Sequence, residues 1–97
     1  MNIIYTQHLK NRLKIRNFPK DYPKNIYISP DEKYKDIEQN SFIAIKKLPY
    51  AGKMKKIMIA YIIEGKNVKI KTIYPENDKD INTRVKNLRW IKLWKIN

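Results

Sequence analysis

Two strand-like runs flank a short turn in the stretch MKKIMIAYIIEGKNVKIKTIY, residues 54–74. The first run, Met54–Ile63, is apolar enough to predict a central strand. Glu64–Asn67 (EGKN) predicts the turn of a hairpin. The second run, Val68–Tyr74, alternates between two faces. One predicted face carries Val68, Ile70, Thr72 and Tyr74, and the other carries Lys69, Lys71 and Ile73.

Further strands are predicted before this hairpin. The periodicity becomes strand-like from Lys33 onward, and Glu38–Asn40 (EQN) is typical of a turn. Ser41–Leu48 (SFIAIKKL) then predicts a strand, and Pro49–Gly52 (PYAG) predicts the turn that leads into the apolar run. Asn2–Tyr5 (NIIY) is short and apolar, which indicates an edge strand at the start of the chain.

A helix is predicted directly after the N-terminal strand. Thr6 is a suitable N-cap for it. Leu9 and Leu13 form its buried stripe, and Pro19 ends it. Asp21–Ile28 (DYPKNIYI) predicts either a short helix with a proline in its first turn or an irregular strand, of which we prefer the helix.

A second clear helix follows Pro75, where Asn77 or Asp78 can act as the N-cap. Its apolar stripe is formed by Ile81, Val85 and Leu88. This order of elements predicts one α+β domain over residues 1–90, a small antiparallel sheet of three to five strands. An N-terminal helix and a C-terminal helix are expected to cover one face of the sheet. Residues 91–97 are expected to form a basic, Trp-containing C-terminal tail.

The composition excludes several kinds of function. Without cysteine, the chain has no disulfide, no thiol catalysis and no Cys-type zinc site. One histidine leaves no cluster of metal ligands, and two glycines exclude a glycine-rich phosphate loop, so no cofactor is expected. No apolar run approaches the ~18 residues of a membrane span. A cytoplasmic protein without a membrane partner is therefore expected.

The formal net charge of +13 favours a polyanionic partner, which is RNA, DNA or an acidic protein. The 18 lysines accompany 17 isoleucines and 10 asparagines, as an AT-rich genome would give, and a solvated lysine coat is the alternative interpretation. The four arginines, however, fall in two pairs, Arg12/Arg16 and Arg84/Arg89. Arginine offers a planar, permanently charged fork that fits phosphate, so the pairs predict phosphate contacts.

The stretch YTQHLKNRLKIR, residues 5–16, contains the only histidine, His8. On a helix, His8, Arg12 and Arg16 lie beside the leucine stripe, at the border between core and surface. Histidine titrates near neutral pH, which makes His8 the candidate general acid or base of RNA cleavage without a metal ion. Arg12, Arg16 and Arg84 would bind phosphate and stabilise developing charge. Alternatively, His8 caps or packs the helix and the arginines lie over the leucines.

Further residues are candidates for substrate contact. Tyr61, Tyr74 or Lys71 would complete the acid–base pair from the rigid centre of the sheet, and Arg89 is another candidate for phosphate contact. The candidates for stacking on a base are Tyr34, Trp90 and Trp94. The alternatives are solvated lysines, tyrosines that pack in the core, and a Trp90 that anchors the last helix to the sheet.

Five short motifs are spread from Ile3 to Trp90. They are Thr6-Gln-His8-Leu-Lys-Asn-Arg12, Pro30-Asp31, Tyr34-Lys-Asp36, Thr72-Ile-Tyr74-Pro75 and Arg84-Val-Lys-Asn-Leu-Arg89-Trp90. Together they resemble the RelE/BrnT-like toxin superfamily, closest to a branch that begins with T-x-H-x-x-x-R. The resemblance implies a compact antiparallel sheet with an N-terminal and a C-terminal helix, RNA cleavage without a metal ion, and a cognate antitoxin. Relatives often carry glycine before the final Arg-Trp, where this chain has Leu88.

Three functions are compatible with these observations. The first is the toxin component of a type II toxin–antitoxin system, an endoribonuclease whose basic cleft is covered by an acidic antitoxin. The second is a nucleic-acid-binding module without catalysis on the same fold. The third is a basic protein-interaction domain that docks an acidic partner. A homodimer through a sheet edge or through the C-terminal tail is compatible with each of them.

Overall fold

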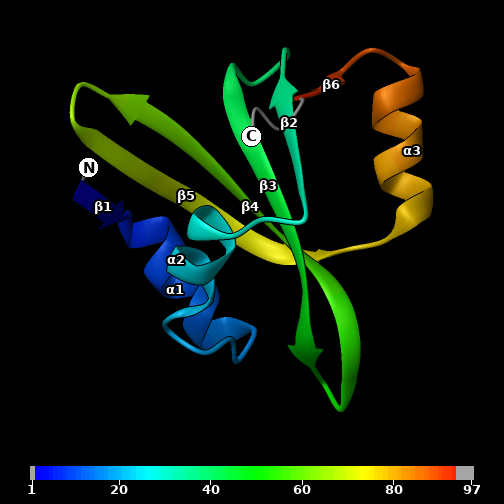
Figure 1. Cartoon of the computed structure of the whole chain (residues 1–97). Coiled ribbons are helices and arrows are strands. Elements are labelled where there is room, and N and C mark those ends of the chain that lie inside the picture. Colours follow the sequence, from blue (N-terminus) through cyan, green and yellow to red (C-terminus); the bar gives the residue numbers. More distant parts are fainter. Residues whose placement is uncertain (1, 94–97) are drawn as a thin grey trace.

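In a computed structural model of the chain, which describes residues 2–93, six strands form one sheet and three helices pack against it (Figure 1). The elements are β1 (Asn2–Tyr5), α1 (Gln7–Ile15), α2 (Tyr22–Ile28), β2 (Glu32–Asp36), β3 (Ser41–Tyr50), β4 (Lys53–Glu64), β5 (Asn67–Glu76), α3 (Asp78–Lys86) and β6 (Trp90–Lys92). The predicted α+β class is confirmed, and so is the preferred helix after Pro19. The sheet is larger than the predicted three to five strands. Within the described residues, no helix is long and apolar enough to cross a membrane.

The strands lie in the order β1-β5-β4-β3-β2-β6 across the sheet. The neighbours from β2 to β5 are antiparallel, as predicted, whereas β1 pairs with β5 in parallel. At the opposite edge, β6 pairs with β2, and Trp90 lies opposite Asp36. The sequence does not predict β6. The predicted tail, residues 91–97, begins within this strand. Trp94, a candidate for base stacking, lies outside the described residues.

Helices cover both faces of the sheet, which corrects the prediction of one covered face (Figure 1). The cause lies in β4, where Ile57 and Ile59 pack under α1 and α2 while Met58 packs under α3. All three side chains are at most 1% exposed. A strand that is apolar on both faces needs a helical layer on each of them.

The start of α1 is fastened to the sheet by Thr6. The Thr6 hydroxyl accepts a hydrogen bond from the Leu9 N–H at 3.2 Å, which confirms the predicted N-cap. The same hydroxyl is 3.2 Å from the carbonyl oxygen of Ile70 and 3.3 Å from that of Lys71, to which it donates. The helix therefore begins beside the middle of β5.

A β-bulge at this point of β5 changes which side chains share a face. The register between β4 and β5 shifts so that Lys71 is an extra residue opposite β4. Strict alternation predicted Ile70 and Ile73 on different faces, but both are fully buried under α1 and α2. Lys71, Thr72 and Tyr74 consequently lie together on the side of the sheet that α3 covers.

Candidate functional site

A cleft of about 200 Å³ opens on the α3 side of the sheet, and we name it the α3 cleft. Side chains from β2 to β6 and from α3 line it. Its polar lining residues are Asp36, Gln39, Ser41, Lys71, Thr72, Tyr74, Arg84 and Arg89. Five predicted site residues are therefore brought together in one cleft: Lys71, Tyr74, Arg84, Arg89 and Trp90.

The turn after α3 brings the two arginines side by side. Leu88 has a φ of 61°, in the left-handed region. The Arg89 N–H donates to the Arg84 carbonyl oxygen at 3.0 Å, and the Leu88 N–H donates to the Val85 carbonyl oxygen at 3.1 Å. These two bonds form a Schellman motif, in which glycine usually occupies the position of Leu88. The turn also carries the chain into β6, so Trp90 begins that strand instead of continuing the helix.

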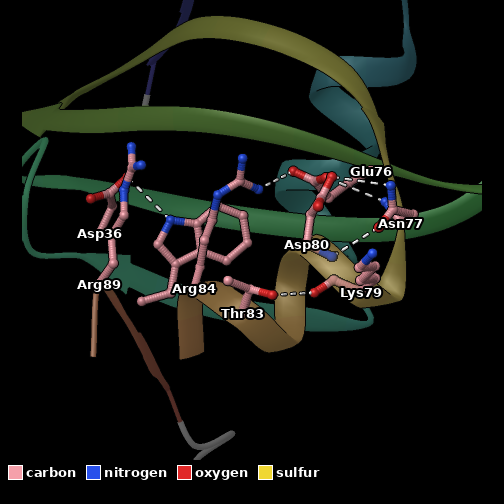
Figure 2. Close-up of polar contacts among 9 residues, drawn as sticks. Asp36, Glu76, Asn77, Lys79, Asp80, Thr83, Arg84 and Arg89 are labelled. Atoms are coloured by element: carbon pink, nitrogen blue, oxygen red, sulfur yellow. Dashed lines mark hydrogen bonds and ion pairs between the residues drawn. The ribbon is translucent and has the colours of Figure 1, made fainter. Parts of the chain in front are cut away.

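Arg84 is held between a carboxylate and an aromatic ring. Its Nη1 forms a short ion pair with Glu76 Oε2, and the Glu76 side chain is only 3% exposed (Figure 2). Its guanidinium carbon lies 4.8 Å from the centre of the Trp90 ring. Burial lowers the pKa of Arg84, but the bond to Glu76 outweighs burial and the net pKa is raised. The arginine is therefore charged and fixed in position.

Arg89 is paired with two carboxylates. Its Nη2 lies 3.7 Å from Asp36 Oδ2, and its Nε lies 3.5 Å from Glu38 Oε2. Asp36 is 3% exposed and also accepts a hydrogen bond of 3.1 Å from Trp90 Nε1. Figure 2 shows Asp36 and Arg89 beside each other at one end of the row of contacts, with Arg84 between them and Glu76. These carboxylates orient the arginines and offset part of their charge.

Within the described residues the side chains of Gln39, Ser41 and Thr72 have no hydrogen-bond partner, and Lys71 and Tyr74 are likewise unpaired polar groups of the cleft. Neither of the last two side chains makes a hydrogen bond or an ion pair with any residue from 2 to 93. Burial raises the pKa of Tyr74 above that of an ordinary tyrosine, so its hydroxyl stays protonated at neutral pH. An anion in the cleft would meet an ammonium and a hydroxyl that have no other partner, beside two oriented arginines.

The remaining predicted polar residues lie elsewhere. His8 and Arg12 are on α1 and Arg16 is its C-cap, and this helix packs on the opposite face of the sheet from α3. Arg12 Nε donates to His8 Nε2 at 3.4 Å on the exposed surface of that helix. The structure therefore does not bring these three side chains into one site with Arg84.

Three aromatic candidates are buried in the core. Tyr61 is 2% exposed on the α1 side, 5.0 Å from the ring of Tyr27, and burial raises its pKa to about 12. Tyr34 and Trp90 are 4% and 2% exposed, and their rings contact each other at 5.4 Å. Tyr61 is therefore not open to a substrate as an acid or base, and neither Tyr34 nor Trp90 offers an open ring to a substrate base, which corrects those expectations. Trp90 instead packs beneath α3, as the alternative interpretation has it.

The sequence does not predict Asp36, Ser41 and Thr72 as residues of this cleft. Asp36 and Ser41 are opposite each other on β2 and β3, and both are at most 3% exposed. Two of the three fall within the short motifs: Asp36 ends Tyr34-Lys-Asp36, and Thr72 begins Thr72-Ile-Tyr74-Pro75. Membership of these motifs was the feature of the sequence that could have identified Asp36 and Thr72 as site residues.

No protein-family model, curated protein or solved structure matches the chain. Across the part of the chain that the structure describes, no group of three or more His, Asp or Glu side chains is placed to hold a metal ion. The geometry of the α3 cleft therefore carries the functional argument.

Proposed function

We propose that this chain is an endoribonuclease that works without a metal ion, the toxin component of a RelE/BrnT-like toxin–antitoxin pair. The observation that supports this most is the convergence of Lys71 and Tyr74, both unpaired within residues 2–93, with Arg84 and Arg89 in one cleft. Cleavage of RNA by its own 2′-hydroxyl needs a base, an acid, and cations around the phosphorus. The cleft offers the acid and the cations.

Tyr74 is suited to the role of the acid. The 2′-oxygen attacks the phosphorus, the bond to the 5′-oxygen breaks, and Tyr74 gives its proton to that leaving oxygen. The raised pKa of Tyr74 keeps this proton in place at neutral pH. Lys71 and the free N–H groups of Arg84 would bind the non-bridging phosphate oxygens. Because Glu76 already orients Arg84, little rearrangement is needed when the charge develops.

Water would serve as the base that takes the proton of the 2′-hydroxyl, because His8 is on α1, which packs on the opposite face of the sheet, and does not line the α3 cleft. A cognate antitoxin would be acidic, because the net charge of +13 favours rapid association with a negatively charged partner.

The test is induced expression in a host cell, with growth and bulk RNA integrity followed together, and cleavage of purified RNA. Wild type should arrest growth and break RNA. Tyr74→Phe should lower the cleavage rate about 100-fold or more while RNA affinity is unchanged. His8→Ala should leave the cleavage rate unchanged, because His8 does not line the cleft.

Lys71→Ala should weaken RNA affinity and lower the salt dependence of binding by about one counterion. The matched control is Lys69→Ala on the same strand, because Lys69 is paired with Glu64 at 2.9 Å. Folded, soluble wild type that leaves growth and RNA intact would reject the endoribonuclease. If Lys71→Ala still weakened salt-dependent RNA binding in that case, the chain would be a non-catalytic nucleic-acid-binding module.

A further inference from the structure

A second and larger hollow lies on the other side of the sheet, along α1. This α1 groove has a volume of about 870 Å³. Its apolar lining includes Leu13, Phe18 and Pro19, and its rim carries Lys10, Lys14 and Lys20. None of the residues predicted for RNA cleavage lines it.

The groove is held open by local hydrogen bonds. Asn17 has a φ of 55° and ends α1 with the same Schellman motif that ends α3: the Phe18 N–H donates to the Leu13 carbonyl oxygen at 3.0 Å. The Tyr5 hydroxyl donates to the carbonyl oxygen of Lys20 at 2.8 Å, which fixes the following loop against β1. The walls of the groove are therefore in place before any partner binds.

The charges along the groove are uncompensated. No carboxylate is among its lining residues, and the ammonium groups of Lys10, Lys14 and Lys20 form no ion pair with any residue that the structure describes. In the α3 cleft, by contrast, both arginines are already paired with carboxylates. The groove thus combines an apolar floor with a positive rim.

We propose that the α1 groove binds an acidic, amphipathic segment of a partner protein. Apolar side chains of the segment would lie against the exposed Pro19 and against the small parts of Leu13 and Phe18 that line the groove, while its carboxylates would face the three lysines. RNA fits the groove less well. The ring of Phe18 is 5% exposed and already stacks on Tyr50 at 4.4 Å, so it is not open to a base. This inference uses a different surface from the proposed nuclease site and does not depend on it.

The proposal is tested with fluorescence anisotropy on the full chain. The probe is a labelled helical peptide of about 15 residues, with leucines at i, i+3, i+4 and i+7 and aspartate or glutamate elsewhere. A scrambled peptide of the same composition has the same charge but no apolar face. The test variant is Lys10→Glu with Lys14→Glu. The control, Lys66→Glu with Lys79→Glu, makes the same change in net charge at exposed positions outside the groove.

The groove variant should lose at least about tenfold in affinity for the patterned peptide, and the control variant less than about threefold. Wild type should bind the patterned peptide more tightly than the scrambled one. Equal losses in both variants, or equal affinity for both peptides, would overturn the proposal by showing attraction to net charge alone. The groove variant could also lose more affinity for single-stranded RNA than for the patterned peptide. That result would overturn the proposal and assign the groove to nucleic acid.

Discussion

Leu88 occupies a backbone conformation that costs a residue with a side chain about 1–2 kcal/mol. Its side chain is 75% exposed, so packing does not repay this cost. Leu88→Gly should therefore raise the free energy of unfolding by about 1 kcal/mol, and the midpoint of thermal unfolding by about 4–8 °C. Circular dichroism during heating measures both.

The control for this prediction is Leu88→Ala. Alanine removes most of the exposed side chain but keeps Cβ, and with it the unfavourable left-handed conformation. Its unfolding free energy should therefore stay within about 0.5 kcal/mol of wild type. A less stable Leu88→Gly protein would mean that the Leu88 side chain, and not the turn conformation, stabilises the end of α3.

Trp90 donates a hydrogen bond to the buried carboxylate of Asp36, and removal of this bond should lower the stability measurably. Trp90→Phe keeps an aromatic ring but removes the Nε1 donor to Asp36. Leaving that acceptor short of a partner should cost about 2 kcal/mol of stability, measured by urea unfolding. The double variant Trp90→Phe/Asp36→Ala should cost less than the sum of the single changes, since the two groups depend on each other. A strictly additive result would contradict this role of the pair.

At the scale of elements, Lys56 ties β4 to β2 and to the first turn of α3. Its ammonium lies 2.8 Å from Glu32 and 2.7 Å from Asp78. Burial raises the pKa of Glu32, but the hydrogen bonds from Lys56 and Tyr34 outweigh burial, and the net pKa is lowered. The hydrogen bond from Lys56 likewise lowers the pKa of Asp78. Each carboxylate binds its proton less readily in the folded chain than in the unfolded one.

Stability from this ion-pair network should be fully present above the ordinary carboxyl pKa values of 4.5 and 3.8, and should be lost as the pH falls below them through the lowered pKa values of the folded chain. Lys56→Gln should therefore flatten the fall in thermal midpoint in this acid range. Lys55→Gln, a neighbour without a carboxylate partner within the described residues, should leave the slope unchanged. Equal slopes in wild type and Lys56→Gln would show that other carboxylates govern acid unfolding.

The elements themselves could be predicted because caps and periodicity are local signals, as at Thr6 and Asn77. The end of α3 could not be placed, because Leu88 fits the apolar stripe of Ile81 and Val85 but itself adopts the left-handed conformation that ends the helix. Side chains on β5 were assigned to the wrong faces after the bulge at Lys71, since a bulge has no consistent sequence signature.

At the scale of the whole molecule, the two hollows lie on opposite sides of the sheet and should act independently. In about 0.15 M salt, charges farther apart than about 8 Å are largely screened. Saturating the α1 groove with the acidic peptide should therefore change RNA affinity by less than about twofold. The measurement is RNA anisotropy with and without the peptide. Competition between the two ligands would contradict the separation of the surfaces.

The sequence predicted several residues of the candidate site, but it did not predict which of them lie together. Lys71, Tyr74, Arg84 and Arg89 were all candidates, and they converge in the α3 cleft. His8 was predicted to share a site with these residues. An apolar stripe shows which side of a helix is buried, but it does not show which face of the sheet that side packs against. Consecutive apolar residues in β4 carried the missing signal, since a strand buried on both faces separates α1 from α3.

The parallel pairing of β1 with β5 sets an order of events during synthesis. Asn2 pairs with Asn67 and Tyr5 with Ile70, so β1 has no partner until β5 has left the ribosome. Thr6 needs the same segment, because it bonds to the carbonyl oxygens of Ile70 and Lys71. Until then, the apolar stripe of α1 is uncovered in the nascent chain. A translation pause before residue 70 would therefore prolong the interval in which the growing chain is most prone to aggregation or to chaperone binding.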